Sequence, residues 1–407
     1  MVPLLWACGA TLDRSAAPSP SAPPVLGQDW GRTTDVVERP EEAFASNDPQ
    51  YLVPVGSGRS GHPTHFPGQA MMADVLRGPT GYVSVGTVYP GWHPVSWTSS
   101  DGEVWELHRF GAVDYTFPVA SALGADGLIV AVGRSGARPI AWTSTDGAAW
   151  TEHPVPVLGT ADERERMTAV VAGPSEFVAG GSVGPETLAR HARFWRSPDG
   201  STWTPVPDDP TAFADAEVRS IVRLGSGYVA VGLTGEAVRP TGSVAWTSPD
   251  GEHWTRVEAP ALKSGRAVSL VVTPDGGLLA VGAGLDQEEA LVWTSPDGRT
   301  WTRVPGEESR RHDGTIRMND VTVKDGLFVA VGDYAKLQYA TMIVWTSTDG
   351  LHWEKAHEVP VFQQSEAYAV TSGPVPGVGA PVSGFVAVGS FGNPDNYVPT
   401  VWLTPAH

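Results

Sequence analysis

The sequence predicts an all-β protein made of seven similar units, and three observations predict it. The motif Trp-x-Ser-x-Asp-Gly-x-x-Trp occurs six times, with successive aspartates 45 to 53 residues apart. A short strand-like segment that ends in glycine occurs seven times, as does the first tryptophan of the motif. Glycine (47) and proline (36) are abundant in the 407 residues, as many short strands and turns require. A period of about 40 to 50 residues with short strands is typical of propeller blades.

Each unit is expected to hold four strands, taken here in order for the fourth unit. Val218 to Leu224 forms the first strand, and a Gly-Ser-Gly turn follows it. Tyr228 to Gly232 forms the second strand, and after a longer loop Val244 to Ser248 forms the third. Asp250 and the glycine after it then suit a tight hairpin, because glycine tolerates positive φ. Trp254 opens the fourth strand, and two tryptophans per unit are expected to dominate the packing between units.

The motif residues recur through the chain in register. The second strands are expected to end at Gly86, Gly133, Gly181, Gly232, Gly282, Gly332 and Gly389. The motif aspartates are Asp101, Asp146, Asp199, Asp250, Asp297 and Asp349. The third-strand tryptophan occurs a seventh time as Trp402, but the sequence ends at His407 before another motif and fourth strand.

The missing fourth strand bears on how the ring closes, because an unpaired sheet edge would be left exposed. Residues 50–56 resemble the fourth strand of the third unit in pattern and in distance to the next first strand. We therefore expect a single seven-bladed β-propeller over residues 50–407. Its ring would be closed by this N-terminal strand, completing the C-terminal blade.

The segment Ser-x-Asp-Gly-x-x-Trp resembles the Asp-box, or BNR repeat, of sialidases, and is one residue shorter than the common Ser-x-Asp-x-Gly-x-x-Trp form. Similar boxes occur in xyloglucanase-type glycosidases, sortilin-like receptors and photosystem assembly factors. The resemblance covers residues 70–404. It implies that each box lies on the hairpin between third and fourth strands, at the face away from the ligand. The six aspartates are accordingly expected to be structural, and fold alone does not imply function.

Composition excludes some functions and suggests a location. The formal net charge is −18 with only four lysines, so nucleic acid is not an expected partner. No segment approaches the roughly 18 to 20 apolar residues of a membrane helix. The single cysteine, Cys8, lies in a segment that resembles a bacterial lipobox, and a Ser/Ala/Pro-rich stretch follows it. We expect a remnant lipoprotein signal (1–8), a flexible tether and lead-in (9–49), and an extracellular protein anchored by lipid to the bacterial membrane. The alternative is a free cysteine in a tail.

Ligands of propellers usually bind at the mouth of the central channel, which the first strands line. With these strands aligned on Val75, Ala122, Val170, Ile221, Leu270, Val321 and Val370, the positions two and four residues earlier share one parity. They hold Arg166, Glu217 with Arg219, Arg266, Arg317 with Asn319, and Glu366 with Tyr368. Converging arginines could clamp a carboxylate. The alternative is that they are solvated rim charges paired with Glu217, Glu366 and nearby acids.

The resemblance to sialidases also implies a tyrosine nucleophile with a glutamate partner, for which Tyr368 and Glu366 are the candidates. The Arg-Ile-Pro segment typical of those enzymes is absent, and the first blade offers Met71 and Ala73 instead. Tyr368 and Glu366 therefore stay candidates, and no catalytic residue is assigned.

Further candidates lie beside the rim. Asp74 and Asp320 occupy the opposite parity, in register with Ser121, Ser220 and Ser269. They could act as two carboxylates in inverting glycoside hydrolysis, but small residues in register favour a buried role capping backbone. Loops at this face carry aromatic residues that could stack on a sugar, anchor a protein or cover the core: Tyr89, Trp92, Tyr115, Phe117, Tyr334, Tyr339 and Tyr397. His62 and His65 make a poor metal site, so neither metal nor cofactor is expected.

These observations predict a monomeric, non-catalytic cell-surface propeller that binds a glycan or protein partner through its loop face. Tyr89, Trp92 and the rim residues Arg166, Arg219, Arg266, Arg317 and Asn319 are the expected ligand-binding residues. Two alternatives stay open: a sialidase-like or related glycoside hydrolase, and an envelope assembly factor.

Overall fold

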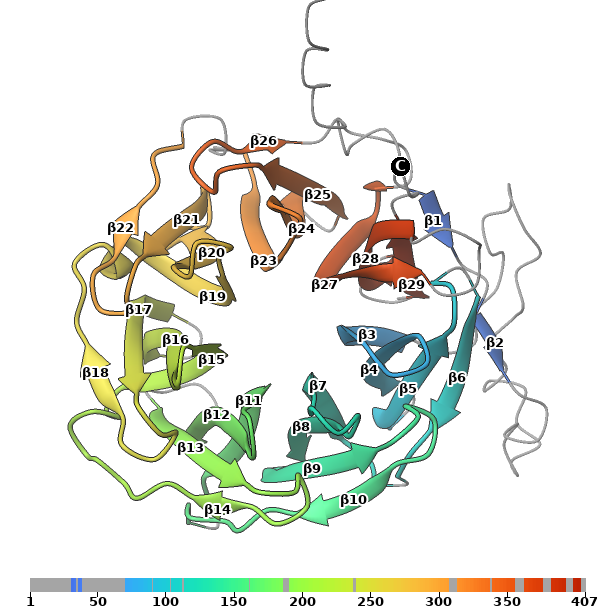
Figure 1. Cartoon of the computed structure of the whole chain (residues 1–407), viewed down its shortest axis with the longest axis horizontal. Helices are drawn as coiled ribbons and strands as arrows, with labels where there is room; N and C mark the ends of the chain where they lie inside the picture. The colour runs from blue at the N-terminus through green and yellow to red at the C-terminus, as the bar shows by residue number, and fades with distance from the viewer. Residues whose placement is uncertain are drawn as a thin grey trace, which may run out of the picture.

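The protein is a ring of seven antiparallel sheets around a central axis, a seven-bladed β-propeller (Figure 1). A computed structural model describes residues 31–33, 36–38, 70–89, 91–102, 104–111, 113–160, 162–185, 190–236, 239–306, 313–336, 339–355, 362–375, 382–392 and 398–403. Within these ranges no helix is long and apolar enough to cross a membrane. The predicted fold class is confirmed.

Each blade runs from the axis outwards in sequence order. The innermost strands are β3 (Ala70–Arg77), β7 (Thr116–Leu123), β11 (Arg164–Ala172), β15 (Ala216–Leu224), β19 (Gly265–Val272), β23 (Thr315–Lys324) and β27 (Ser365–Val375). The second strands are β4 (Tyr82–Val88), β8 (Ile129–Ser135), β12 (Phe177–Gly184), β16 (Gly227–Glu236), β20 (Leu278–Gly284), β24 (Leu327–Lys336) and β28 (Val382–Phe391). The third strands are β5 (His93–Ser99), β9 (Arg138–Ser144), β13 (His191–Ser197), β17 (Arg239–Ser248), β21 (Ala290–Ser295), β25 (Tyr339–Ser347) and β29 (Val398–Leu403).

The outermost strands are shorter. In the first six blades they are β6 (Trp105–Arg109), β10 (Thr151–Pro154), β14 (Thr204–Pro205), β18 (Thr255–Val257), β22 (Thr302–Arg303) and β26 (Glu354–Lys355). A 3-10 helix, η3 (Leu262–Ser264), precedes β19.

The seventh blade is completed from the N-terminal part of the chain. Strand β1 (Gly31–Thr33) pairs antiparallel with β29, so that Arg32 lies opposite Trp402. Strand β2 (Val36–Glu38) pairs parallel with β6 and adds a fifth strand to the first blade. The segment expected to close the ring, residues 50–56, lies outside the described residues. The place beside β29 is taken by β1, inside the range expected to be a tether and lead-in.

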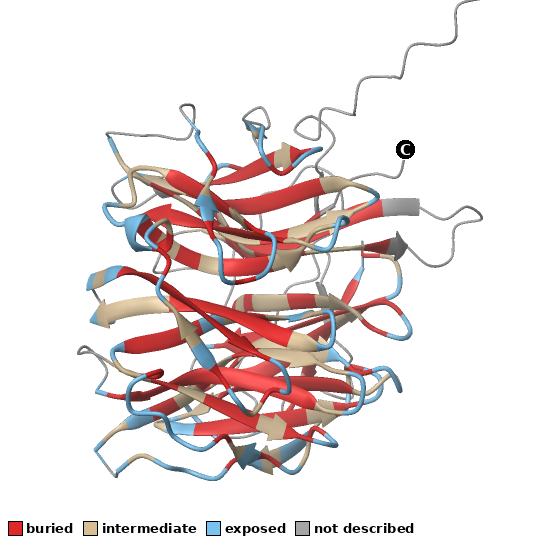
Figure 2. Ribbon diagram, turned by 60° about the vertical axis from the view of Figure 1, so that its left-hand side comes forward, coloured by how far each residue is buried: buried red, intermediate tan, exposed pale blue. Residues whose placement is uncertain are grey.

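The core lies between neighbouring blades rather than at the ring axis (Figure 2). The seven third-strand tryptophans are at most 3% exposed. A representative cluster joins Val229 and Val231 of the fourth blade to Leu278, Leu291 and Trp293 of the fifth. Each buried tryptophan removes roughly 150 to 250 Å² from water, about 4 to 6 kcal/mol of gross hydrophobic stabilisation.

Every innermost strand contains one β-bulge, and the bulge explains the repeated glycine. The pairing register shifts by one residue at Ala73, Val119, Thr168, Arg219, Val268, Asn319 and Tyr368. The bulge brings the first-strand backbone against the second strand. A Cβ on any of the seven second-strand glycines would lie 1.8 to 2.0 Å from a first-strand carbonyl oxygen. The glycine is therefore required by close backbone approach.

The two faces of the ring differ in their connections. One face carries the hairpins between first and second strands and between third and fourth strands, and we call it the turn face. The other carries the connections from second to third strands and from one blade to the next, and we call it the loop face. The motif turns lie on the turn face, and the first strands begin at the loop face.

Candidate functional site

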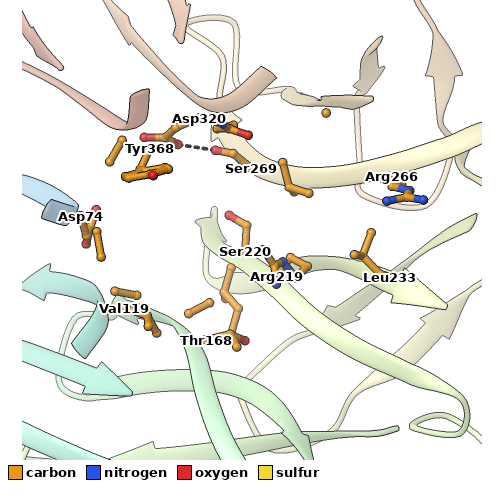
Figure 3. A pocket seen from close by; sticks show the side chains of 18 of the residues that line it. Asp74, Val119, Thr168, Arg219, Ser220, Leu233, Arg266, Ser269, Asp320 and Tyr368 are labelled. Atoms are coloured by element: carbon orange, nitrogen blue, oxygen red, sulfur yellow. Dashed lines mark hydrogen bonds between the residues drawn. The ribbon is translucent and has the colours of Figure 1, made fainter. Parts of the chain in front are cut away.

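A cavity of about 790 Å³ occupies the ring axis at the loop face (Figure 3). Its walls come from the N-terminal halves of the first strands, including Arg166, Arg219, Arg266, Arg317 and Tyr368. Because side chains of a strand alternate between faces, the bulged residue of each first strand and the residue two positions earlier both turn towards the axis. Six of the eight rim residues expected from parity line this cavity: Arg166, Arg219, Arg266, Arg317, Asn319 and Tyr368. Glu217 and Glu366 are not among its lining residues.

The second strands contribute a further residue to this region. The residue that follows each second-strand glycine pairs across the sheet with the outer rim residue of the same blade, as Asp333 does with Arg317 and Ser182 with Arg166. This position also holds Arg134, which lines the cavity, and Ser390. Sequence reasoning missed these residues, although the repeated glycine immediately before them would have marked the position.

The register of the second blade differs from expectation by one residue. The bulge at Val119 makes Ala120, rather than Ser121, the equivalent of Asp74. The sequence alignment of this first strand on Ala122 is therefore wrong by one residue. The extra residue of the bulge follows Pro118, and the hydrophobic pattern does not show where it is inserted. Val119 and Ser121 both line the cavity.

Glu217 forms ion pairs with arginines of the third and fourth blades. Its carboxylate is 7% exposed and forms ion pairs with Arg166, Arg190 and Arg219, the last at 2.9 Å. Ser182 Oγ also donates to it at 3.4 Å. Arg190, which immediately precedes β13, was not foreseen, because no repeat position carries it. Three guanidiniums around one carboxylate leave this side of the cavity with excess positive charge.

Arg266 of the fifth blade has a different environment. Its Nη2 donates to the Leu285 carbonyl oxygen at 3.0 Å, and its buried Nε has no hydrogen-bond partner among the residues that the structure describes. The described residues include no carboxylate in ion-pair contact with it. Burial, together with the nearby charge of Arg317, lowers the pKa of Arg266, and the charge of Asp286 acts against them. An anion entering the cavity would relieve both effects.

The sixth and seventh blades form an acidic cluster around Arg317. Arg317 Nε and Asn319 Nδ2 both donate to Asp333 Oδ1, at 3.0 and 2.9 Å. Burial raises the pKa of Asp333, against the lowering effect of Arg317. In the seventh blade the Tyr368 hydroxyl donates to Glu366 Oε2 at 2.6 Å and lies 3.0 Å from Ser390 Oγ. The two residues proposed as nucleophile and partner are therefore hydrogen-bonded.

Asp74 and Asp320 tie adjacent blades together at the cavity floor. Asp74 Oδ2 accepts the N–H and hydroxyl of Ser121 in the second blade at 2.6 and 2.7 Å. Asp320 accepts the Ser269 hydroxyl at 2.6 Å and the Val370 N–H at 2.8 Å, from the blades on either side. Burial raises the pKa of Asp74 and raises that of Asp320 to about 7. Both carboxyl groups cap backbone, which is the structural role favoured by the sequence.

The aromatic residues form a short stack at the seam of the first two blades. Tyr89 and Trp92 have ring centroids 5.6 Å apart, and Trp92 and Phe117 5.9 Å apart. The Arg134 guanidinium lies 4.1 Å from the Phe117 ring centroid. Tyr89 and Tyr115 are 46% and 59% exposed. Phe117 lies within β7 rather than in a loop.

Two further aromatic candidates lie in strands rather than in loops. Tyr334 belongs to β24 and Tyr339 to β25. Tyr397, Cys8, His62 and His65 are outside the described residues. No group of three or more potential metal ligands occurs in the part of the chain that the structure describes.

Fold and cavity together define a seven-bladed β-propeller with a charged cavity on its axis. No protein-family model matches the sequence, and no curated protein matches it. Among solved structures, YCF48 bound to a D1 peptide is 17% identical, covers 84% of this chain and 93% of its own, and has a TM-score of 0.51. A protein of unknown function from Dyadobacter fermentans is 15% identical, with 84% and 95% covered and a TM-score of 0.50. A GH43 β-1,3-galactosidase is 10% identical, with 61% and 93% covered and a TM-score of 0.37. At these identities the similarity shows the fold alone.

Proposed function

We propose that the protein is a non-catalytic binding propeller that takes an acidic group of a glycan or protein partner at the loop-face cavity. One observation carries the proposal: Arg166, Arg219 and Arg266 line the cavity, and the described residues bring only Glu217 into ion-pair contact with them. In a molecule of net charge −18 this local excess of positive charge is unusual. Guanidinium groups bind carboxylates strongly through paired hydrogen bonds.

A hydrolase is the second candidate, and the hydrogen bond between Tyr368 and Glu366 favours it. A sialidase-like reaction would require arginines to gather around the tyrosine. Figure 3 instead draws Arg266 and Tyr368 on opposite sides of the cavity, and Arg317 is held by Asp333. This distribution favours binding over turnover. Hydrolysis of an aryl sialoside by pure protein, lost in Tyr368→Phe, would reverse that preference.

Binding is tested by calorimetry with an acidic oligosaccharide, such as sialyllactose, and its neutral analogue lactose. We expect the acidic sugar to bind more tightly, with an affinity that falls as salt rises. Arg266→Ala should weaken binding by about 1.5 to 3 kcal/mol, the range for a hydrogen bond to a charged group. Arg299→Ala, an exposed arginine on the turn face, is the matched control. Equal affinities for the two sugars would contradict the proposal and indicate that the arginines are solvated rim charges.

The location is a further part of the proposal. We propose that the chain is an Asp-box propeller anchored at the cell surface through a lipid on Cys8. Metabolic labelling with a radioactive fatty acid should mark the protein, and Cys8→Ser should abolish the label and release the protein from the membrane fraction. A label retained in Cys8→Ser would refute the anchor.

A further inference from the structure

The inward-facing residues of the seven blades are not distributed evenly. At the two rim positions of each first strand, the first blade carries Met71 and Ala73, and the second carries Phe117 and Val119. Met71, Ala73 and Val119 line the cavity. The same positions in the third to fifth blades hold Arg166, Thr168, Glu217, Arg219, Arg266 and Val268. At these two positions the cavity is therefore apolar on the side of the first two blades, which we call the apolar wall, and largely cationic on the side of the third to fifth, the cationic wall. Asp74, Ser121 and Arg134 also line the cavity from the first two blades, at other positions.

An apolar wall restricts which anions fit. Methyl and thioether groups offer no strong hydrogen-bond partner, so a hydroxyl pressed against Met71 or Val119 would lose its water without replacement. Such an unsatisfied polar group weakens binding. A sugar acid carries hydroxyls around its whole ring, and an aliphatic or aromatic acid does not. The two walls together therefore favour a carboxylate attached to an apolar body.

The aromatic stack of Tyr89, Trp92 and Phe117 belongs to the same two blades as the apolar wall, although none of the three residues lines the cavity itself. The two loops that carry it are joined by backbone hydrogen bonds, from Tyr115 N–H to the Gly91 carbonyl (2.6 Å) and from Thr116 N–H to the Trp92 carbonyl (3.0 Å). Trp92 and Tyr115 have φ of 56° and 59°, a conformation that is uncommon for large side chains. Backbone held this way marks a surface whose shape is set before binding.

The cavity's volume and position limit the size of the ligand. About 790 Å³ lies within the range of roughly 300 to 1,000 Å³ typical of small-molecule sites. Asp74 and Asp320 line its floor, where each carboxyl group also holds an adjacent blade. A site of this size and depth admits a small acid or the last residue of a chain.

We propose that the cavity binds an amphiphilic carboxylate, with the carboxylate against Arg219 and Arg266 and an aliphatic or aromatic body against Met71, Ala73 and Val119. This inference rests on the proposed function and specifies its ligand chemistry. Two sources supply that chemistry: the free carboxyl terminus of a polypeptide ending in an apolar residue, and a small arylalkanoic acid.

Calorimetry on the full chain tests the proposed amphiphilic ligand with four probes. They are N-acetyl-diglycyl-phenylalanine as the free acid, the same peptide as its amide, 3-phenylpropionate, and glucuronate. The free acid should bind at least about tenfold more tightly than the amide, because the amide loses a charged hydrogen bond. Phenylpropionate should likewise exceed glucuronate by about tenfold. If the peptide acid and phenylpropionate bind with similar affinity, the cavity recognises a small acid. If the peptide acid binds much more tightly than phenylpropionate, the cavity recognises the carboxyl terminus of a polypeptide.

A pair of matched variants locates the apolar wall. Val119→Thr replaces a methyl by a hydroxyl of nearly equal size and should weaken phenylpropionate binding by about fivefold or more. Val104→Thr makes the same change at a half-exposed position on the turn face and should leave the affinity unchanged. Melting temperatures of both variants check that the fold is intact.

The outcomes separate the two proposals. Equal binding of phenylpropionate and glucuronate, both lost in Arg266→Ala, would overturn the amphiphilic ligand and leave the acidic-ligand function standing. An unchanged affinity in folded Val119→Thr would also overturn the apolar wall. No binding of any acid at millimolar concentration, sialyllactose included, would overturn both.

Discussion

At the scale of single residues, the motif aspartate acts as a cap for its hairpin. Asp250 Oδ1 accepts the backbone N–H groups of Glu252 and His253 at 3.0 and 2.8 Å. Ser248 Oγ accepts the Gly251 N–H at 2.9 Å, where φ is 76°. The Trp254 indole N–H donates to the Gly251 carbonyl at 2.9 Å, which orients the ring towards the core. Serine, aspartate, glycine and tryptophan recur together because each satisfies a different group of one turn.

Replacement of Asp250 by alanine should therefore reduce stability without affecting the cavity. We expect a loss of about 1 to 2 kcal/mol in the free energy of unfolding, as for the loss of a capping carboxylate. Urea denaturation measures the loss, and calorimetry with the acidic probes measures binding. A folded Asp250→Ala protein with normal stability and impaired binding would contradict the structural assignment.

The individual rim residues show what sequence can and cannot resolve. Arg166, Arg219, Arg266 and Arg317 could be placed in one cavity because strand alternation fixes the side of the sheet. The sequence also offers Glu217 as a partner, and Glu217 pairs with Arg219 on its own strand and with Arg166 of the neighbouring blade. Asp333 could not be placed, because it meets Arg317 from a different strand. Arg190 enters from a connection that has no counterpart in the repeat, so no periodic signal marks it.

At the scale of elements, the repeat predicted strand order and hairpins, because glycine, proline and tryptophan mark the same points in every blade. It did not predict the bulges. A bulge adds one residue to one strand, and the apolar pattern near Pro118 is equally compatible with either register. Residues 50–56 were chosen for closure on pattern alone, whereas a three-residue strand such as β1 carries too few residues for any pattern.

Ring closure provides a test at this scale. A chain that begins at Glu41 lacks β1 and β2 but keeps residues 50–56, and a chain that begins at Val25 keeps all three. If β1 completes the seventh blade, loss of its pairing with β29 exposes a sheet edge and the Trp402 region, and the Glu41 chain should melt at a lower temperature. Differential scanning calorimetry compares the two. Equal melting temperatures would contradict closure by β1 and favour residues 50–56 as the strand that completes the seventh blade.

At the scale of the whole molecule, carboxyl groups of two kinds make stability depend on pH in opposite directions. In the motif turns, hydrogen bonds to backbone lower the pKa of Asp146, Asp250, Asp297 and Asp349 despite partial burial, and the pKa of Asp199 falls to about 2. At the cavity floor, burial raises the pKa of Asp74, and that of Asp320 reaches about 7. The first group stabilises the fold when ionised and the second when protonated.

The signs follow from proton uptake. For the turn aspartates the unfolded chain binds protons more readily, so their stabilisation is present above about pH 4 and is lost as pH falls towards 2. For Asp320 the folded chain binds the proton more readily, so stability is highest below about pH 4 and declines as pH rises towards 7. Self-repulsion at a net charge of −18 acts in the same direction as Asp320. Maximal stability is therefore expected in mild acid.

Asp320→Asn isolates the buried group. An asparagine can keep both contacts, with its oxygen accepting the Val370 N–H and its amide donating to Ser269, yet it cannot ionise. Urea denaturation at pH 4, near the unfolded pKa, should find the variant and the natural protein similar. At pH 8 the variant should be more stable by roughly 2 to 4 kcal/mol, the scale of a shift of a few pKa units. Asp275→Asn removes the same charge from an exposed hairpin and controls for self-repulsion. If both variants gain equally at pH 8, the dependence belongs to overall charge, and Asp320 has no special part in holding its neighbouring blades.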